Sequence, residues 1–230
     1  MTNHQQATII LTNDDGIDAP GIRALQSAIS RPSILVAPQN QLSGCGHQVT
    51  TQKPFQVEAR SPTEYAVAGT PADCTRVAVT QFENIEWVLS GINAGGNLGT
   101  DVYISGTVAA VREAAMRGIK GIAISHWIKR PLVVDWQVAT VWTAKVLAQL
   151  WELPLPVGRF WNVNLPHLEP GTAMPEIVFC PPSTDPLPLG YRLEGDLYQY
   201  QGRYSDRDRT PGTDVDVCFN GQIAVTQISL

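Results

Sequence analysis

Two adjacent carboxylates follow the first apolar run of the chain. Residues 9–11 (Ile-Ile-Leu) are typical of a strand that is buried on both faces of a parallel sheet, and Asp14, Asp15 and Gly16 come soon after it. Two carboxylates about 5 Å apart repel each other by roughly 3 kcal/mol at an effective dielectric of about 20, so a cation or a shared proton must offset that cost. A hard divalent cation with oxygen ligands meets this need. The structural alternative is an ordinary Asn-Asp-Asp-Gly surface turn.

A glycine-rich loop is the second feature that suggests chemistry. Residues 91–101 contain four glycines and two asparagines, and Ser105, Gly106 and Thr107 then lead into a helical pattern. A loop of this kind before a helix N-terminus presents backbone N–H groups to an anion, and the helix dipole favours negative charge there. The loop matches neither the GxGxxG fingerprint nor the P-loop. It therefore predicts a site for a phosphate ester or a mononucleotide, with a flexible loop and a capped helix as the structural alternative.

Further apolar runs predict the strands that would position these loops. They lie at residues 34–37, 86–90, 121–125, 160–165 and 176–180. Because helical patterns alternate with these runs, we expect right-handed parallel crossovers and a three-layer, Rossmann-like, doubly wound and mostly parallel α/β sheet. Ligands of such sheets bind beyond the carboxyl ends of the strands. Ser43, in the loop at residues 39–47, is thus expected to face the same crevice as Asp14, although a serine beside glycines is usually only a loop residue.

Polar residues that precede the helical patterns predict where the helices begin. Asp18 is expected to cap a helix that has Pro20 in its first turn. Thr70, followed three residues later by Asp73, has the pattern of a capping box. Asp135 is expected to cap a helix that runs to about residue 152.

The chain changes character after residue 180. Four prolines at residues 181–188 predict a stiff linker, and residues 191–204 predict a polar, aromatic β-hairpin. Arg203, Arg207 and Arg209 alternate with aspartates, which is typical of a solvated or subunit-facing surface. An isolated hairpin is marginal in water, so its tyrosines need a partner. We therefore expect a Rossmann-like α/β catalytic core at residues 1–180, and at residues 181–230 a hairpin extension and a last strand that take part in oligomerisation.

Composition narrows the classes of partner. The chain has 230 residues, 43% of them hydrophobic and 16% charged, and a net charge of −5. These values indicate a globular protein, and they argue against a nucleic-acid polymer or an anionic membrane as the main partner. Four cysteines and four histidines are widely scattered, which argues against a structural zinc site. Residues 1–7 are polar and no run reaches transmembrane length, so we expect a cytoplasmic location.

Four ordered motifs resemble the SurE family. They are Thr-Asn-Asp-Asp-Gly at residues 12–16 with Ala-Pro-Gly at 19–21, Val-Ala-Pro at 36–38 before Ser-Gly at 43–44, Gly-Thr-Pro-Ala-Asp-Cys at 69–74, and residues 90–99 with Ser-Gly-Thr-Val-Ala-Ala at 105–110. The resemblance is strong over residues 8–126 and weaker as far as residues 211–214. It implies a metal-dependent 5′-nucleotidase that hydrolyses nucleoside monophosphates to nucleoside and phosphate, on a Rossmann-like core with oligomer-forming C-terminal segments. A homodimer or homotetramer is expected.

The resemblance also implies roles for single residues. The implied ligands of one divalent metal per subunit, magnesium or manganese, are Asp14, Asp15, Ser43 and Asn93. The implied phosphate-binding residues are Asn97, Ser105, Gly106 and Thr107. Asp14 and Asn97 form the implied catalytic pair, with Asp14 able to handle a proton.

Two rival functions fit parts of the same pattern. An aspartyl-phosphate phosphatase would use Asp14 or Asp15 as a nucleophile, but that chemistry normally requires an Asp-x-Asp spacing. The alternative from another class is a nucleotide-binding protein that has lost catalysis. It is suggested by the C-terminus, because family members usually continue into a helical arm at the point where this sequence reaches residue 230. Residues 39–42 also differ from the acidic and basic stretch usual in the family, so substrate or effector contacts there are expected to differ.

Overall fold

The computed structural model describes residues 8–230, so the polar residues 1–7 lie outside the described part. Its strands are β1 (Thr8–Thr12), β2 (Ser33–Pro38), β3 (Val57–Ser61), β4 (Glu64–Val67), β5 (Ile85–Ala94), β6 (Lys120–His126), β7 (Arg159–Leu165), β8 (Ile177–Phe179), β9 (Tyr191–Glu194), β10 (Leu197–Tyr200) and β11 (Ile223–Ser229). Its α-helices are α1 (Pro20–Ser27), α2 (Pro71–Gln81), α3 (Gly106–Met116), α4 (Trp136–Leu150) and α5 (Asp214–Phe219). Two 3₁₀ turns are η1 (Gly99–Tyr103) and η2 (Tyr204–Asp206).

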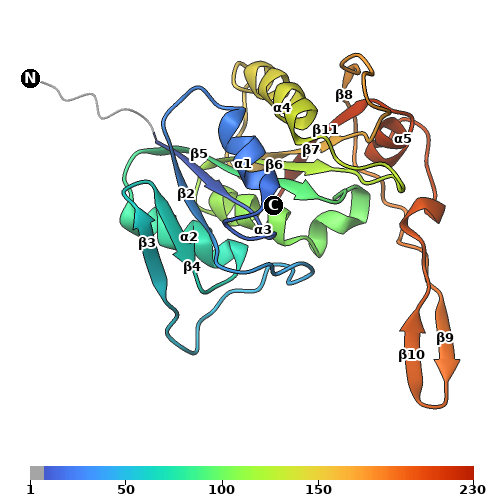
Figure 1. Ribbon diagram of the computed structural model, residues 1–230, viewed down its shortest axis with the longest axis horizontal. Helices are drawn as coiled ribbons and strands as arrows, with labels where there is room; N and C mark the ends of the chain where they lie inside the picture. The colour runs from blue at the N-terminus through green and yellow to red at the C-terminus, as the bar shows by residue number, and fades with distance from the viewer. Residues whose placement is uncertain (1–7) are drawn as a thin grey trace, which may run out of the picture.

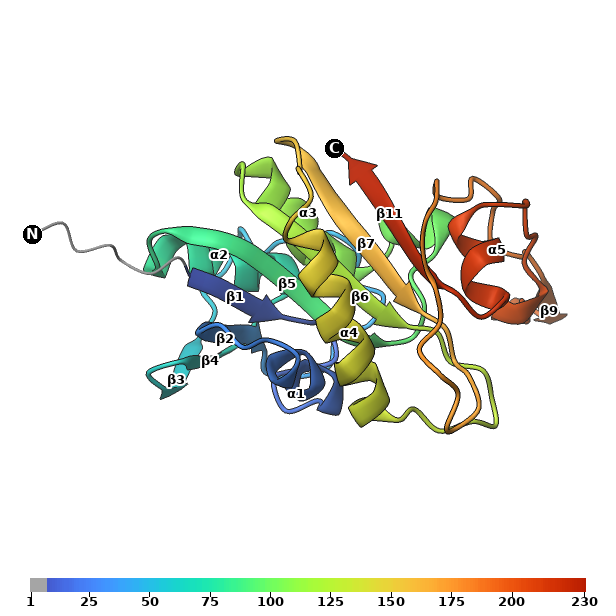
Figure 2. The same ribbon diagram turned by 90° about the horizontal axis from the view of Figure 1, so that it is seen from above.

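A nine-stranded sheet forms the centre of the molecule, in the order β3-β4-β2-β1-β5-β6-β7-β11-β8. The strands from β4 to β7 in this order all pair in parallel, whereas β3 pairs antiparallel with β4 and β11 antiparallel with β7. Helices α1 and α4 cover one face of the sheet, and α2 and α3 cover the other (Figures 1 and 2). The predicted three-layer, mostly parallel architecture is confirmed.

The first apolar run shows why the sheet is buried on both faces. Ile9, Ile10 and Leu11 are all completely buried. Ile9 and Leu11 pack in the cluster that contains α1 and α4, while Ile10 packs in the cluster with α2 and α3. Successive residues of a strand point to opposite faces, so a continuous apolar run is required where helices cover both.

The predicted helix starts are confirmed at two places and wrong at one. Thr70 and Asp73 form a reciprocal capping box, in which Thr70 Oγ1 accepts from Asp73 N at 3.1 Å and Asp73 Oδ2 accepts from Thr70 N at 3.0 Å. Asp135 caps α4 through the backbone N–H groups of the first turn. Asp18 does not cap α1, because the cap residue is Ala19 and the Asp18 carboxylate instead pairs with Arg60 at 2.7 Å.

The C-terminal segment is divided between the sheet and a projection. β11 lies inside the nine-stranded sheet, between β7 and β8, whereas β9 and β10 pair only with each other and project from the body (Figure 1). The large apolar and aromatic side chains of this hairpin are exposed. The division of the chain into two parts at residue 180 stays a prediction. The last strand of the second part, β11, belongs to the same sheet as the strands of the first part.

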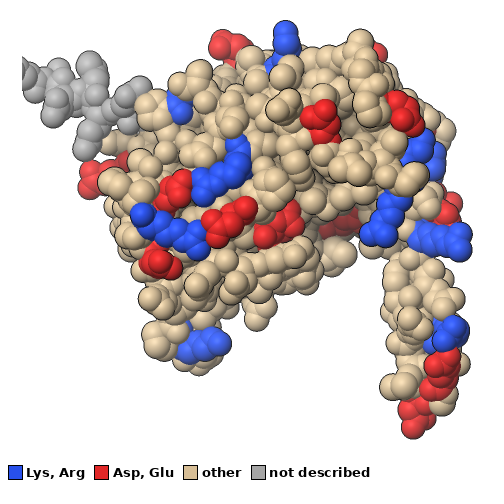
Figure 3. Space-filling model, viewed as in Figure 1, with Lys and Arg blue, Asp and Glu red and all other residues tan. Residues whose placement is uncertain are grey.

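The expectation that the alternating arginines lie on a solvated or subunit-facing surface is wrong for Arg207. Its side chain is completely buried, because it forms an ion pair with Asp101 on the loop after β5. Arg203 and Arg209 are exposed. Acidic and basic side chains are interspersed on the face shown in Figure 3, including the tip of the hairpin. Within residues 8–230, none of the helices has the length and apolar character needed to cross a bilayer.

Candidate metal and phosphate site

A cleft of about 370 Å³ lies beyond the carboxyl ends of the central strands. β2, β1 and β5 are neighbours in the sheet, so the loops that follow them meet at one edge. The sequence-predicted residues that line this cleft are Asp14, Asp15, Ser43, Asn93, Asn97 and Ser105. The structure thus brings together residues that lie up to 91 positions apart in the chain, as the topology of a doubly wound sheet requires.

The turn after β1 presents the two carboxylates. Asn13 holds this turn, because its Nδ2 donates to Gly16 O at 2.8 Å and its Oδ1 accepts from Gly16 N at 3.2 Å. The side chain of Asn13 is therefore occupied with the backbone, which leaves Asp14 and Asp15 as the groups available to the cleft. Asp14 is 5% exposed and Asp15 is partly buried.

The first turn of α3 packs directly on Asp14. Thr107 Oγ1 donates to Asp14 Oδ1 at 2.5 Å, and Thr107 itself is completely buried. Gly106 permits this approach, since a Cβ atom at that position would lie 3.0 Å from Asp14 Cβ and 3.1 Å from Cys45 Sγ. Thr107 and Gly106, expected to bind phosphate, therefore lie against the Asp14 carboxylate, and the hydroxyl of Thr107 is already used by it.

Asp15 is connected to the neighbouring loops by two hydrogen bonds. Ala94 N donates to Asp15 Oδ2 at 3.1 Å, which joins the end of β5 to the turn after β1. Gln41 Nε2 lies 3.4 Å from Asp15 Oδ1 and 2.9 Å from Ser43 Oγ. Gln41 is thus a site residue that the sequence reasoning did not assign, although the unusual composition of residues 39–42 pointed to this loop.

The electrostatics of the pair favour a bound cation. Burial raises the pKa of Asp14 to about 6, even though the hydrogen bond from Thr107 lowers it, and the charge of Asp15 raises it further. Burial also raises the pKa of Asp15, against the hydrogen bond from Ala94. Within residues 8–230, no lysine, arginine or histidine forms an ion pair with either carboxylate. The two negative charges therefore lack a compensating group from the described chain.

The donor atoms in the cleft suit a hard divalent cation. Asn93 Nδ2 donates to Gly95 O at 2.7 Å, so the amide oxygen Oδ1 remains as an acceptor. With the two carboxylates and the hydroxyl of Ser43, the cleft offers only oxygen ligands, which magnesium and manganese prefer. The described part of the chain has no cluster of three or more His, Cys, Asp or Glu side chains that could hold a metal. A metal in this cleft would therefore depend on Ser43 and Asn93 as well as on the carboxylates.

Asn97 and Ser105 also line the cleft. Asn97 Nδ2 donates to Ser125 Oγ at 2.8 Å, which fixes the orientation of the amide. Ser105 is the N-cap of α3, because its Oγ accepts from Val108 N at 3.1 Å. The N-terminus of α3 therefore begins at the cleft, next to Asp14, where its dipole favours an anion.

Two asparagines on β7 hold the backbone of Asn97. Asn164 Oδ1 accepts from Asn97 N at 2.8 Å, and the Nδ2 atoms of Asn162 and Asn164 both donate to Asn97 O, at 2.8 and 3.0 Å. Both asparagines are buried. Neither was expected from the sequence, although they form a pair of amides at alternate positions of the apolar run at residues 160–165.

Comparisons with known proteins show what this chain is similar to. The family model described as "Survival protein SurE" matches residues 9–184. A protein from Nostoc sp. is 62% identical to this chain, over 96% of the chain and 99% of its own length. The relative named 5′-nucleotidase SurE from Moorella thermoacetica is 36% identical over 96% of this chain and 90% of its own length.

A solved structure supports the same relationship. The crystal structure of the SurE protein from Aquifex aeolicus superposes with a TM-score of 0.85 at 28% identity, and the match covers 96% of this chain and 93% of that one. The family model spans more than half of the chain, and the Moorella relative exceeds 30% identity over nearly all of it. This chain belongs to the SurE family.

Proposed function

We propose that this chain is a metal-dependent phosphomonoesterase that hydrolyses nucleoside monophosphates to nucleoside and phosphate. The observation that carries the proposal is the position of Asp14 and Asp15 beside the N-terminus of α3 in one cleft. A metal ion would compensate a pair of carboxylates that forms no ion pair with the described chain, and a helix N-terminus beside it favours a phosphate group. The name of the Moorella relative, 5′-nucleotidase SurE, gives the substrate class.

In this proposal the metal is held by Asp14, Asp15, Ser43 and Asn93. When bound, such an ion supplies Lewis-acid stabilisation of the phosphoryl charge. Asn97 and Ser105, which line the same cleft, orient the phosphate group against the first turn of α3. Proton transfer is assigned to Asp14 Oδ2, since the other oxygen of this carboxylate is occupied by Thr107 Oγ1.

The test is turnover of purified protein on a panel of 5′- and 3′-nucleoside monophosphates. Release of inorganic phosphate is expected with Mg²⁺ or Mn²⁺ and not after treatment with a chelator. The test variant is Asp15→Asn, which alters an acidic residue in the cleft. Its matched control is Glu58→Gln, which alters an exposed acidic residue on β3. Nucleotide binding without turnover in the presence of either metal would contradict the proposal and favour a binding protein without catalysis.

We also propose that the molecule forms a homodimer or homotetramer through the β9–β10 hairpin. The side chains of this hairpin are exposed, including Tyr191, Leu193, Leu197 and Tyr198. Tyrosine-rich surfaces of this kind are typical of interfaces between subunits, and a second copy of the chain would cover them. Light scattering tests the proposal, and a monomer at micromolar concentration would contradict it.

A further inference from the structure

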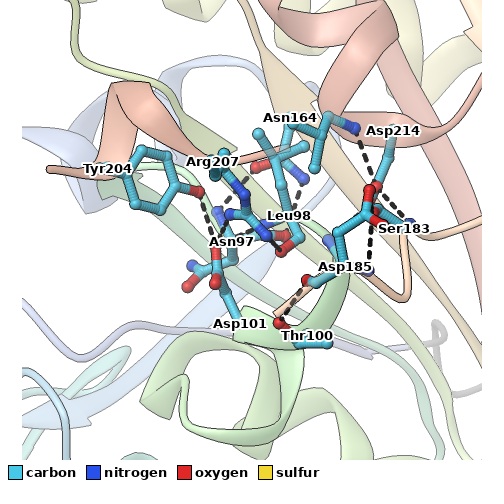
Figure 4. A network of polar contacts seen from close by, with 12 residues as sticks. Asn97, Leu98, Thr100, Asp101, Asn164, Ser183, Asp185, Tyr204, Arg207 and Asp214 are labelled. Carbon is cyan, nitrogen blue, oxygen red and sulfur yellow. Dashed lines mark hydrogen bonds and ion pairs between the residues drawn. The ribbon is translucent and has the colours of Figure 1, made fainter. Parts of the chain in front are cut away.

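Arg207 connects the C-terminal segment to the loop that follows β5 (Figure 4). Its Nη1 donates to Asp101 Oδ2 at 2.7 Å, and its Nη2 donates to Leu98 O at 3.2 Å. The side chain of Arg207 is completely buried. Its Nε is buried and has no hydrogen-bond partner among residues 8–230, so the ion pair with Asp101 and the bond to Leu98 are the side-chain contacts that offset its burial.

One carboxylate oxygen of Asp101 accepts hydrogen bonds from the loop after β5 and from the C-terminal segment. Besides Arg207 Nη1, its Oδ2 accepts from Leu98 N at 3.2 Å and from Tyr204 Oη at 2.6 Å. The other oxygen, Oδ1, is buried and has no hydrogen-bond partner among residues 8–230. Asp101 therefore depends on Arg207 for its charge balance. Burial, together with the charge of Asp101, raises the pKa of Tyr204, so this phenol stays protonated and remains a donor.

Asp214 holds the same loop from a second position. Its Oδ2 accepts from Gly99 N at 2.7 Å, and its Oδ1 accepts from Ser183 N at 2.8 Å. Side chains of the C-terminal segment thus hold Leu98 and Asp101 (Figure 4), and Asp214 holds Gly99. Asp214 is completely buried, and so is Leu98.

The loop held in this way carries the phosphate-binding side of the cleft. It runs from Asn97 to Ser105, and both of these residues line the cleft. Asp101 O accepts from Ser105 N at 3.1 Å, so the position of Asp101 also fixes the start of α3. The hydrogen bonds of Arg207 do not involve Asp14 or Asp15, which lie on the turn after β1.

We propose that Arg207 is a positioning residue for the reaction: through Asp101 and Leu98 it fixes Asn97 relative to Ser105, and so sets the affinity of the cleft for a phosphate group. This inference rests on the proposed function of the cleft. The planar guanidinium places two donors at fixed directions on two acceptors, whereas a lysine ammonium is a compact point charge without this fork. Small displacements of groups that orient a substrate lower rates or affinities by as much as about 100-fold.

The experiment compares Arg207→Met and Arg207→Lys with the matched control Arg203→Met, which alters an exposed arginine four residues away. The measurements are kcat and KM for 5′-AMP, the Mn²⁺ concentration that gives half-maximal activity, and the Kd for inorganic phosphate by calorimetry. For Arg207→Met we expect KM and the phosphate Kd to rise by roughly tenfold or more. We expect Arg207→Lys to raise KM and the phosphate Kd by less, because lysine keeps the positive charge but lacks the second hydrogen bond, to Leu98 O. The Mn²⁺ requirement of both variants is expected to stay within about twofold of wild type, and Arg203→Met to match wild type throughout.

Several results would overturn the proposal. Wild-type KM and phosphate Kd in Arg207→Met would do so, and so would equal losses of phosphate and Mn²⁺ affinity, which indicate a general structural defect. If Arg207→Met does not fold, Arg207→Lys decides by the same two measurements. If the wild-type protein hydrolyses no nucleotide, the proposed function fails, while the phosphate Kd of the variants still tests the role of Arg207 separately.

Discussion

Replacing Thr107 by valine should weaken the proposed metal site, because Thr107 holds the Asp14 carboxylate. Thr107 is completely buried, and its hydroxyl donates to Asp14 Oδ1 at 2.5 Å. Valine has nearly the same shape but no donor, so the carboxylate oxygen would lose its partner without gaining a water molecule. A hydrogen bond to a charged group contributes about 1.5–3 kcal/mol to the free energy of unfolding. For a chain of this length that corresponds to a fall in Tm of roughly 3–12 °C.

The same substitution should also lower metal affinity. Groups that hydrogen-bond to a metal ligand orient it, and their loss typically costs about 10- to 100-fold in affinity or activity. We therefore expect Thr107→Val to need about 10- to 100-fold more Mn²⁺ for half-maximal hydrolysis, and Thr107→Ser, which keeps the hydroxyl, to stay close to wild type. Unfolding is measured on chelator-treated protein and metal dependence on the folded enzyme. Wild-type behaviour of the valine variant would refute this reasoning, and so would a serine variant as impaired as the valine one.

Four further outcomes are expected. Asp14→Asn and Asp15→Asn should each lower hydrolysis by about 100-fold or more while the circular dichroism spectrum stays unchanged, because each removes a charged ligand without changing volume. Gly106→Ala should lower the free energy of unfolding by about 1–3 kcal/mol in denaturant titrations, since its Cβ would lie 3.0 Å from a side-chain carbon of Asp14. Glu113 lies on α3 and pairs with Arg76, His47 and Arg117. Burial raises the pKa of Glu113, but hydrogen bonds from these partners lower it to a net value below 4.5. Its stabilising effect is therefore complete above pH 4.5 and lost as pH falls through the folded-state pKa, so Glu113→Gln should flatten the dependence of the free energy of unfolding on pH in that acid range. Replacing the β9–β10 hairpin by a short Gly-Ser linker should convert the proposed oligomer to a monomer in light scattering, and an oligomeric mass that does not change would contradict the role of the hairpin.

The sequence by itself was sufficient for features that depend on neighbouring residues. The run at residues 9–11 predicted a strand covered on both faces, because a strand buried between two helical layers must be apolar at every position. The capping box of Thr70 and Asp73 is likewise a local pattern, and it is present. The meeting of Asp14 and Ser43 in one cleft followed from a rule of topology, since parallel strands place their following loops at one edge, whereas Asn93 was expected there from the family resemblance.

Only the tertiary structure decided which polar side chains are buried and what they contact. The arginines near residue 207 alternate with aspartates, and charged residues are nearly always exposed unless they are paired. The partner of Arg207 lies 106 positions away, so no local pattern could reveal that this one arginine is buried. The same reason applies to Thr107, whose hydroxyl meets a carboxylate 93 positions away at the point where α3 packs against the end of β1. Local sequence fixes the elements and the loops between them, whereas packing of distant segments selects the pairs that hold the cleft together.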